Sequence, residues 1–200
     1  MQRMEVVEFP KTDAFKVIFT GNIGYAQGLD VLPRTAALLK EHGKNVLFCI
    51  VGDGRYMEEF KKEIAKLQVE DMFCLTGRKP AEEIPKLLAA CDVAFLSFME
   101  TKLFEMTIPA KLQSYMACGM PVIAAAAGET ERIIKEARCG AYSPSGDEKA
   151  LAESIEKLME CSEEDVEEMK KNSRAYFEEH FEKKQLMNQM DRYFHENIVD

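Results

Sequence analysis

Lys111 is the residue whose position says most about chemistry. It lies two residues after Pro109 in the stretch "TIPAKLQSYMACG" (107–119), where Pro109 and Ala110 suit the start of a helix. The unpaired N–H groups and the positive dipole end already make a helix start electropositive, so a lysine there is unfavourable unless an anion is bound. We therefore expect an anion site at this helix start. The alternative is that the lysine side chain extends outward into solvent.

A second candidate is the glycine-rich stretch "TGNIGYAQGLD" (20–30), which follows an apolar run and precedes a helical pattern. Its glycines, Gly21, Gly24 and Gly28, lack the G-x-G-x-x-G spacing of dinucleotide-binding proteins, and a P-loop would require G-K-[ST]. The stretch instead offers backbone N–H groups and the side chains of Asn22 and Gln27. These groups suit an anion, although glycines also form tight turns that bind nothing.

Two further loops carry weaker signals. Gly52 and Gly54 in "VGDG" (51–54) would let a ligand approach the backbone, but Asp-Gly is also an ordinary turn pair. Arg78 and Lys79 leave the apolar run 72–76 together. They suit a phosphate or a ring face, or they are solvated surface charges.

The elements that must position these residues alternate along the chain, with short apolar runs of strand length between amphipathic stretches of helix length. The expected strands are 15–20, 45–51, 72–76, 93–97, 121–126 and 141–143, and the expected helices are 28–42, 55–67, 85–90, 109–118, 129–137, 147–160, 163–179 and 182–196. Continuous apolar strands predict an α/β fold: a Rossmann-like, doubly wound parallel sheet of about six strands with helices on both faces, plus C-terminal helices. Ligands of such sheets bind at the carboxyl ends of the strands. Pro33 predicts that the first long helix is kinked or begins late.

Composition limits the function classes. The 200 residues, 46% of them hydrophobic, fit one domain over 1–200 whose last part, 163–200, forms the C-terminal helices. No run approaches the roughly 20 apolar residues of a membrane span and no apolar signal region is visible, so we expect a cytoplasmic protein. A net charge of −9 argues against nucleic-acid binding. The six cysteines and three histidines do not cluster, which predicts small buried thiols and no metal site.

Six stretches in order resemble the C-terminal, nucleotide-sugar-binding half of family-four glycosyltransferases, whose two Rossmann-like domains form the type-B fold. They read "FTGNIGYAQGLDVL", "FCIVGDG", "LTGRKP", "LLAACDVAFLS", "IPAKLQSYMACGMPVIAAAAGETERII" and "CGAYSPSGDEKALAESI". The subgroup with G-N-I-G-x-A-Q-G-L and I-P-x-K-L-x-x-Y-M-A is the most similar. Its members are bacterial enzymes that build surface polysaccharides.

The resemblance assigns the first loop to the diphosphate of the sugar donor. In the family this loop carries an Arg and a Lys, whose places are taken here by Asn22 and Gln27. Both charges are therefore missing, and the loop offers only hydrogen bonds and backbone dipoles. Lys111 is then expected to stabilise the leaving diphosphate together with the helix start, so that the anion site is moved rather than lost.

The Glu-x7-Glu motif of the family is absent as well. Alignment puts Met106 at the first glutamate and Ser114 at the second. Glu105 lies one residue from the first place and is the candidate substitute, although a shift of one residue changes where a side chain points.

The resemblance places the nucleobase and ribose between the two weaker loops described above, after 45–51 and after 72–76. The sugar is expected near Gly128 and Glu129, and Glu131 matches a carboxylate of the family. From physical chemistry alone, Glu131 is equally a solvated first-turn carboxylate that the helix dipole favours.

The resemblance implies a retaining, metal-independent transfer that needs no cofactor, with a nucleotide diphosphate sugar, expected to be UDP-linked, as substrate and a glycan or lipid-linked acceptor. Such an enzyme has two domains, so we expect a missing N-terminal acceptor-binding domain or partner subunit, and this chain alone to be inactive. The full enzyme would lie in the cytoplasm, at the inner face of the membrane. The terminal helices carry more apolar residues than one packed face needs, which predicts contact with the missing half or a homodimer through these helices.

Two other classes stay open. One is a non-catalytic nucleotide-binding or regulatory module or subunit, which the missing Arg, Lys and Glu residues would suit. The other is a nicotinamide-dependent oxidoreductase or sugar-nucleotide epimerase, against which the absent G-x-G-x-x-G and Tyr-x-x-x-Lys patterns speak.

Overall fold

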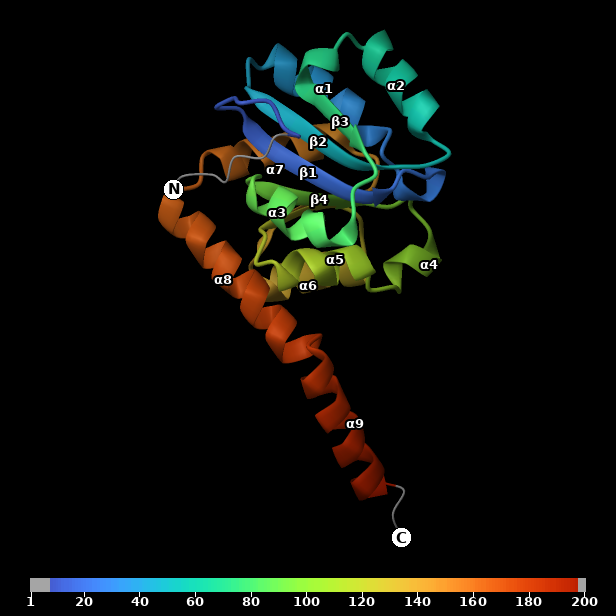
Figure 1. Cartoon of the computed structure of the whole chain (residues 1–200), viewed down its shortest axis with the longest axis vertical. Helices are drawn as coiled ribbons and strands as arrows, with labels where there is room; N and C mark the ends of the chain where they lie inside the picture. The colour runs from blue at the N-terminus through green and yellow to red at the C-terminus, as the bar shows by residue number, and fades with distance from the viewer. Residues whose placement is uncertain (1–7, 198–200) are drawn as a thin grey trace.

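The computed structural model describes residues 8–197 and contains a parallel sheet with helices around it (Figure 1). The strands of the described part are Phe15–Asn22 (β1), Val46–Asp53 (β2), Phe73–Gly77 (β3), Val93–Ser97 (β4), Val122–Ala125 (β5) and Gly140–Ser143 (β6). The α-helices are Val31–Glu41 (α1), Met57–Lys66 (α2), Ile84–Ala89 (α3), Lys102–Glu105 (α4), Ala110–Ala117 (α5), Glu129–Ala137 (α6), Glu148–Met159 (α7), Glu163–His180 (α8) and Lys183–Asn197 (α9). Three short 3-10 turns join them at Tyr25–Gln27, Glu70–Met72 and Ala81–Glu83.

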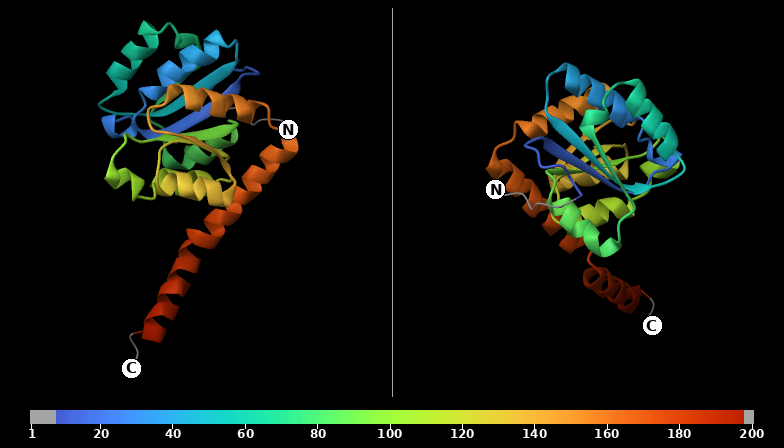
Figure 2. Two further views of the ribbon diagram at one scale, coloured as in Figure 1. Left: turned by 180° about the vertical axis from the view of Figure 1, so that it is seen from behind. Right: turned by 45° about the horizontal axis from the view of Figure 1, so that its top comes forward.

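The strand order is β3-β2-β1-β4-β5-β6, and every neighbouring pair is parallel. One hydrophobic cluster joins the sheet to α1, α2 and α7, and a second joins its other face to α3, α5 and α6. The inner strands β4 and β5 are buried along their whole length because helices cover both faces of the sheet (Figure 2). The predicted doubly wound α/β fold is confirmed.

The order of the strands reverses between β1 and β4, and here the sheet splits. β1 pairs with β2 along all of its eight residues, whereas it pairs with β4 only at Val17 and Ile18. The ends of β1 and β4 beyond these residues therefore diverge. A split of this kind at the reversal point is the place where doubly wound sheets bind ligands.

One local feature confirms a sequence-based expectation, and another was not predicted. The first long helix begins at Val31, so Pro33 lies in its first turn, where a missing N–H costs nothing; this is the late start that Pro33 predicted. The short helix α4 was not predicted, because four residues carry no measurable periodicity. It is set by Thr101, whose side chain accepts a hydrogen bond from the Phe104 N–H.

The prediction that the cysteines are buried is only partly correct. All six are free thiols, but only Cys49, Cys91 and Cys139 are buried, and Cys118 is exposed. Cys118 is the residue that ends α5, so it follows the last helical turn out to the surface. Burial raises the pKa of the Cys139 thiol to about 12.

The two C-terminal helices behave differently. Helix α8 packs across α5 and α6, and its Ser173 hydroxyl donates to the Met120 carbonyl at 2.7 Å. Helix α9 extends away from the body of the molecule (Figure 1), and its apolar residues are largely exposed. No helix in residues 8–197 is long and apolar enough to span a membrane.

Candidate functional site

A cavity of about 710 Å³ lies at the carboxyl ends of β1, β2 and β3, between α3 and α5. Its lining comes from three strand ends and two helices, as a doubly wound sheet requires of its ligand site. The residues that line it are Thr20, Gly21, Asn22, Val51, Gly52, Asp53, Arg78, Lys79, Ala81, Ile84, Pro85, Leu88, Lys111, Ser114, Ala117 and Cys118.

Lys111 lies in the first turn of α5 and does not extend outward. Its amine donates to the side-chain oxygen of Gln27 and lies 4.2 Å from the centre of the Phe19 ring and 5.8 Å from that of Phe98. Phe19 belongs to the hydrophobic cluster on the far face of the sheet from α5, so the lysine side chain reaches through the split between β1 and β4. This position favours the anion-site interpretation over the solvated one.

The charge of Lys111 is poorly compensated where it stands. Burial lowers the pKa of this amine to about 7, from an ordinary value near 10.5. Pro109, which precedes the helix, makes no side-chain hydrogen bond to the first turn. An anion in the adjoining cavity would stabilise both the buried ammonium and the start of α5.

Some residues of the first glycine-rich loop line the cavity, and others hold the residues that line it. Gly21 and Asn22 are the last residues of β1 and line the cavity. Gln27, in the turn that follows, holds the Lys111 amine, and its carbonyl accepts a 2.5 Å hydrogen bond from Ser97 at the end of β4. Gly24 and Gly28 flank that turn and do not line the cavity.

Gly52 is required by packing within the sheet. Its φ is +146°, and a Cβ at this position would lie 1.8 Å from the carbonyl oxygen of Gly21. The space that a Cβ of Gly52 would need is therefore taken by β1, although other atoms of Gly52 line the cavity. Gly54 is close to the backbone of Ile23 in the same way and does not line the cavity.

The two basic residues after β3 differ in their partners. Both line the cavity, but the Lys79 amine lies 3.5 Å from a carboxylate oxygen of Glu8, whereas Arg78 is exposed. A lysine that is paired with a carboxylate attracts a second anion less strongly. Arg78 is therefore the better candidate for contact with a ligand.

One face of α5 adds Ser114 and Cys118, which the sequence analysis did not assign to a binding site, to the Lys111 that it did. Lys111, Ser114 and Cys118 follow one another at helical spacing and line the same cavity. The Ser114 hydroxyl donates to the Ala110 carbonyl at 2.9 Å. This spacing was visible in the sequence and would have predicted the shared face once Lys111 was placed. Pro109 and Ala110 start the helix and do not line the cavity.

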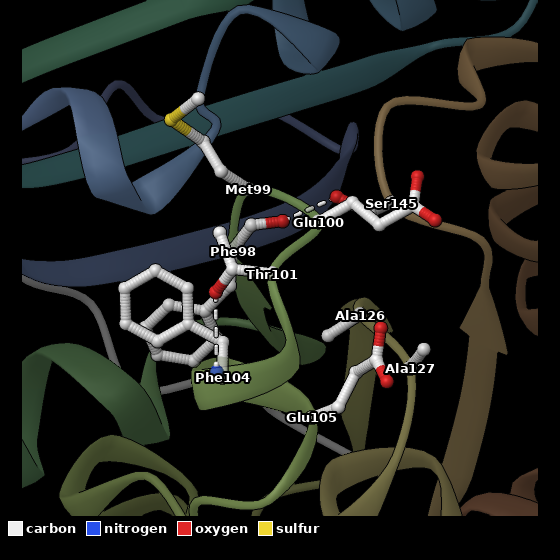
Figure 3. A pocket seen from close by; sticks show the side chains of 9 residues that line it. All are labelled: Phe98, Met99, Glu100, Thr101, Phe104, Glu105, Ala126, Ala127 and Ser145. Carbon is white, nitrogen blue, oxygen red and sulfur yellow. Dashed lines mark hydrogen bonds between the residues drawn. The ribbon is translucent and has the colours of Figure 1, made fainter.

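Glu105 belongs to a separate, narrow crevice beside α4 (Figure 3). The crevice is lined by Phe98, Met99, Glu100, Thr101, Phe104, Glu105, Ala126, Ala127 and Ser145. The rings of Phe98 and Phe104 stack at 4.8 Å, and Ser145 donates to the Phe98 carbonyl, so the crevice is well packed. Met106, the aligned place of the first family glutamate, is 80% exposed. The structure does not bring Glu105 to the cavity that Lys111 lines.

The turn before α6 packs against the end of α4. Gly128 has a φ of +71°, and a Cβ there would lie 2.1 Å from the Glu105 carbonyl oxygen. Glu129 pairs with Arg132 and Glu131 with Lys135 along the surface of α6, and neither glutamate lines the cavity or the crevice. These pairs match the solvated first-turn alternative.

No group of three His, Cys, Asp or Glu side chains in residues 8–197 is arranged to hold a metal ion. The three histidines, which are the commonest type of catalytic base, line neither the cavity nor the crevice. The three histidines lie on helices or at a helix end, and His42 is bound to Glu156 at 2.7 Å.

Comparison with known proteins finds a family model and relatives that are all glycosyltransferases. The family model described as "Glycosyl transferases group 1" matches residues 2–176. The amylovoran biosynthesis glycosyltransferase AmsK of Erwinia amylovora is 29% identical over 72% of this chain and 35% of its own length. The putative colanic acid biosynthesis glycosyltransferase WcaL of Escherichia coli K12 is 26% identical over 88% of this chain and 43% of its own.

The fold also matches solved structures. Anabaena Alr3699/HepE, crystallised in complex with UDP, superposes with a TM-score of 0.79 and 22% identity over 92% of this chain and 49% of its own. At this identity the match concerns the fold. The chain spans less than half the length of each of these relatives.

Proposed function

The chain belongs to the group 1 glycosyltransferases, and from this membership we propose that its cavity binds the nucleotide diphosphate of a sugar donor. The chain would be the donor-binding half of an enzyme that transfers the sugar to a glycan or lipid-linked acceptor in bacterial surface polysaccharide synthesis. The names of AmsK and WcaL support this process.

The observation that carries the proposal is the position of Lys111. Its amine stands in the split of the sheet, in the first turn of α5 and beside Gly21, where an added Cβ would lie 3.4 Å from the lysine Cδ. A diphosphate at this point would be bound by an ammonium and a helix start, and both would stabilise the charge that develops on the leaving group. The arrangement would compensate for the two cations of the family, whose places Asn22 and Gln27 take here.

A diphosphate at Lys111 determines where the nucleoside and the sugar of the donor would lie. The nucleobase and ribose would occupy the part of the cavity lined by Gly52, Asp53 and Arg78. The sugar would extend in the opposite direction, toward the α4 crevice and the start of α6. UDP is the expected nucleotide, which the UDP and UDP-glucose complexes of HepE support. The name of one relative, a GDP-mannose-dependent mannosyltransferase, keeps GDP as the competing choice.

The whole enzyme requires more than this chain. Its relatives are more than twice as long, so an acceptor-binding domain or partner subunit would close over the cavity. A retaining, metal-independent transfer would then occur in the cleft between the halves. A lipid-linked acceptor would locate the full enzyme at the inner face of the membrane.

A non-catalytic nucleotide-binding module is the second candidate. It is favoured by Asn22, Gln27, Met106 and Ser114, which stand where the family has charged residues. Such a module would bind the nucleotide without supporting transfer when the other half is supplied.

The test is calorimetric titration of the chain with UDP, GDP, ADP and NAD. We expect one nucleoside diphosphate to bind selectively and Lys111→Ala to weaken it by at least about tenfold. Lys61→Ala, which removes an exposed lysine paired with Glu58, is the matched control and should bind normally. Binding of none of the diphosphates would contradict the proposal, and selective binding of NAD would favour the oxidoreductase class.

A further inference from the structure

The hydroxyl of Tyr115 bonds to the part of β1 that does not pair with β4. β1 stops pairing with β4 after Ile18, and two residues further on the Thr20 backbone N–H donates to the Tyr115 hydroxyl at 3.0 Å. The Thr20 hydroxyl lies 3.2 Å from the same oxygen, and the Thr20 carbonyl accepts from it at 3.4 Å. A side chain of α5 therefore takes the place of the missing strand partner.

Tyr115 and Lys111 lie one turn apart on the same face of α5. They contact consecutive parts of β1: Tyr115 bonds to Thr20, and the Lys111 side chain lies beside Gly21 and over Phe19. The bond to Thr20 therefore ties α5 to β1 next to the residue that the Lys111 side chain contacts.

We propose that Tyr115 is a positioning residue for the anion site, which holds α5 against the open end of β1 and so sets the place of the Lys111 amine. The nature of the anion rests on the proposed function, whereas the placement of the amine does not. Filling the split with a side chain alone does not require a hydroxyl, because the ring of a phenylalanine has nearly the same volume.

The energetics of the site agree with this role. Tyr115 is completely buried, and a buried hydroxyl is tolerated only when it is hydrogen-bonded. Burial raises the pKa of Tyr115 to about 12, so the hydroxyl stays protonated and can donate to the Thr20 carbonyl while it accepts from the N–H. The Tyr115 hydroxyl thereby provides hydrogen bonds for both the backbone N–H and the carbonyl of Thr20.

The first test compares Tyr115→Phe with the unaltered chain in titrations with UDP and with uridine, and with GDP and guanosine in parallel. A displaced amine weakens only the diphosphate contact, so the diphosphate affinity should fall about tenfold while the nucleoside affinity stays within about twofold. Equal losses for both, or no loss, would overturn the inference. Tyr176→Phe, whose hydroxyl bonds Glu136 on the outer helix layer, is the matched control.

The second test needs no nucleotide. In chains labelled with ¹³C at lysine Cε, the Lys111 resonance, assigned with Lys111→Ala, should titrate near its lowered pKa in the unaltered chain. In Tyr115→Phe the titration should move upward, toward the ordinary lysine value, because a released amine regains water. An unmoved titration contradicts the inference, whereas failure of the unaltered chain to bind any diphosphate contradicts the proposed function alone.

Circular dichroism and thermal melting establish that each variant is folded at the temperature used. If Tyr115→Phe does not fold, Thr20→Val removes one of the hydrogen bonds while α5 stays unaltered. It should shift the Lys111 titration in the same direction by a smaller amount. A titration that is identical to that of the unaltered chain would overturn the inference in this variant too.

Discussion

The amine of Lys111 lies 4.2 Å from the centre of the Phe19 ring, although the two residues belong to opposite faces of the sheet. The contact is made through the gap that opens where β1 and β4 stop pairing. An aromatic face attracts a cation but does not replace its hydration. The buried ammonium therefore costs stability, and an anion bound beside it would offset part of that cost.

The first prediction concerns pH. Burial lowers the pKa of Lys111 to about 7, and only the protonated amine attracts a diphosphate. Affinity for UDP should therefore fall as pH rises above about 7, by up to about tenfold per pH unit, because each binding event must then take up a proton. Calorimetric titrations at pH 7, 8 and 9 measure the affinity, and repeating them in buffers of different ionisation enthalpy measures the proton uptake.

Lys111→Ala is the control for this dependence and should show a flat profile over the same range. Protonation of the terminal phosphate affects both proteins equally and lies below the range, near about pH 6. A profile of the unaltered chain that matches the variant would show that Lys111 does not carry the charge.

The second prediction is that Lys111→Met stabilises the chain. The folded pKa lies below the unfolded one, so the unfolded state binds more protons between about pH 7 and 10.5, and the burial penalty is largest at and below pH 7. Replacement by an apolar side chain of similar length should raise the free energy of unfolding by about 1–3 kcal/mol at pH 6. The gain should shrink toward pH 10.

Urea denaturation of the two proteins at pH 6 and pH 10 measures this effect. Lys61→Met, at an exposed ion pair of α2, should change the free energy of unfolding by no more than about 0.5 kcal/mol at either pH. A loss of stability in Lys111→Met would mean that its contacts with Gln27 and Phe19 outweigh the cost of burial.

The third prediction concerns the close approach of β1 and β2. In Gly52→Ala the new Cβ would overlap the Gly21 carbonyl oxygen, and the φ of +146° is unfavourable for alanine. We expect a loss of about 3 kcal/mol or more in the free energy of unfolding. Gly43→Ala is the matched control, because its φ is also positive but no atom of residues 8–197 lies within 4 Å of the added Cβ; a loss of about 1 kcal/mol is expected there. Equal losses in urea denaturation would show that strain at φ, not the contact with Gly21, is decisive.

Much of the fold was predictable because the strand runs are continuously apolar and the helices are amphipathic. β4 and α6 begin and end where the sequence indicated, and most other boundaries differ by one or two residues. Lys111 was predicted as a site residue from the electrostatic cost of a lysine at a helix start, and the structure places it in the lining of the cavity. The importance of Tyr115 was not visible, because the split that it fills depends on where β1 and β4 stop pairing.

Other parts of the site depend on tertiary contacts that no local pattern encodes. The surface pairs of Glu129 and Glu131 follow from which face of α6 meets solvent. Lys79 pairs with Glu8, a residue 71 positions away in sequence. The exposure of Cys118 follows from the end of α5, whereas its apolar neighbours in sequence favoured burial.

The last prediction separates the two C-terminal helices. Phe177 on α8 packs against the cluster around α5 and α6, whereas Phe194 on α9 is 44% exposed and lies in an apolar strip with Leu186, Met190 and Tyr193. Phe177→Ala should lower the free energy of unfolding by about 2–4 kcal/mol, and Phe194→Ala by less than about 0.5 kcal/mol. The strip should instead promote association, because exposed apolar surface of this kind is usually covered by a partner. Sedimentation of the chain at increasing concentration should therefore show association that Phe194→Ala weakens, whereas unchanged association would place the contact elsewhere on the molecule.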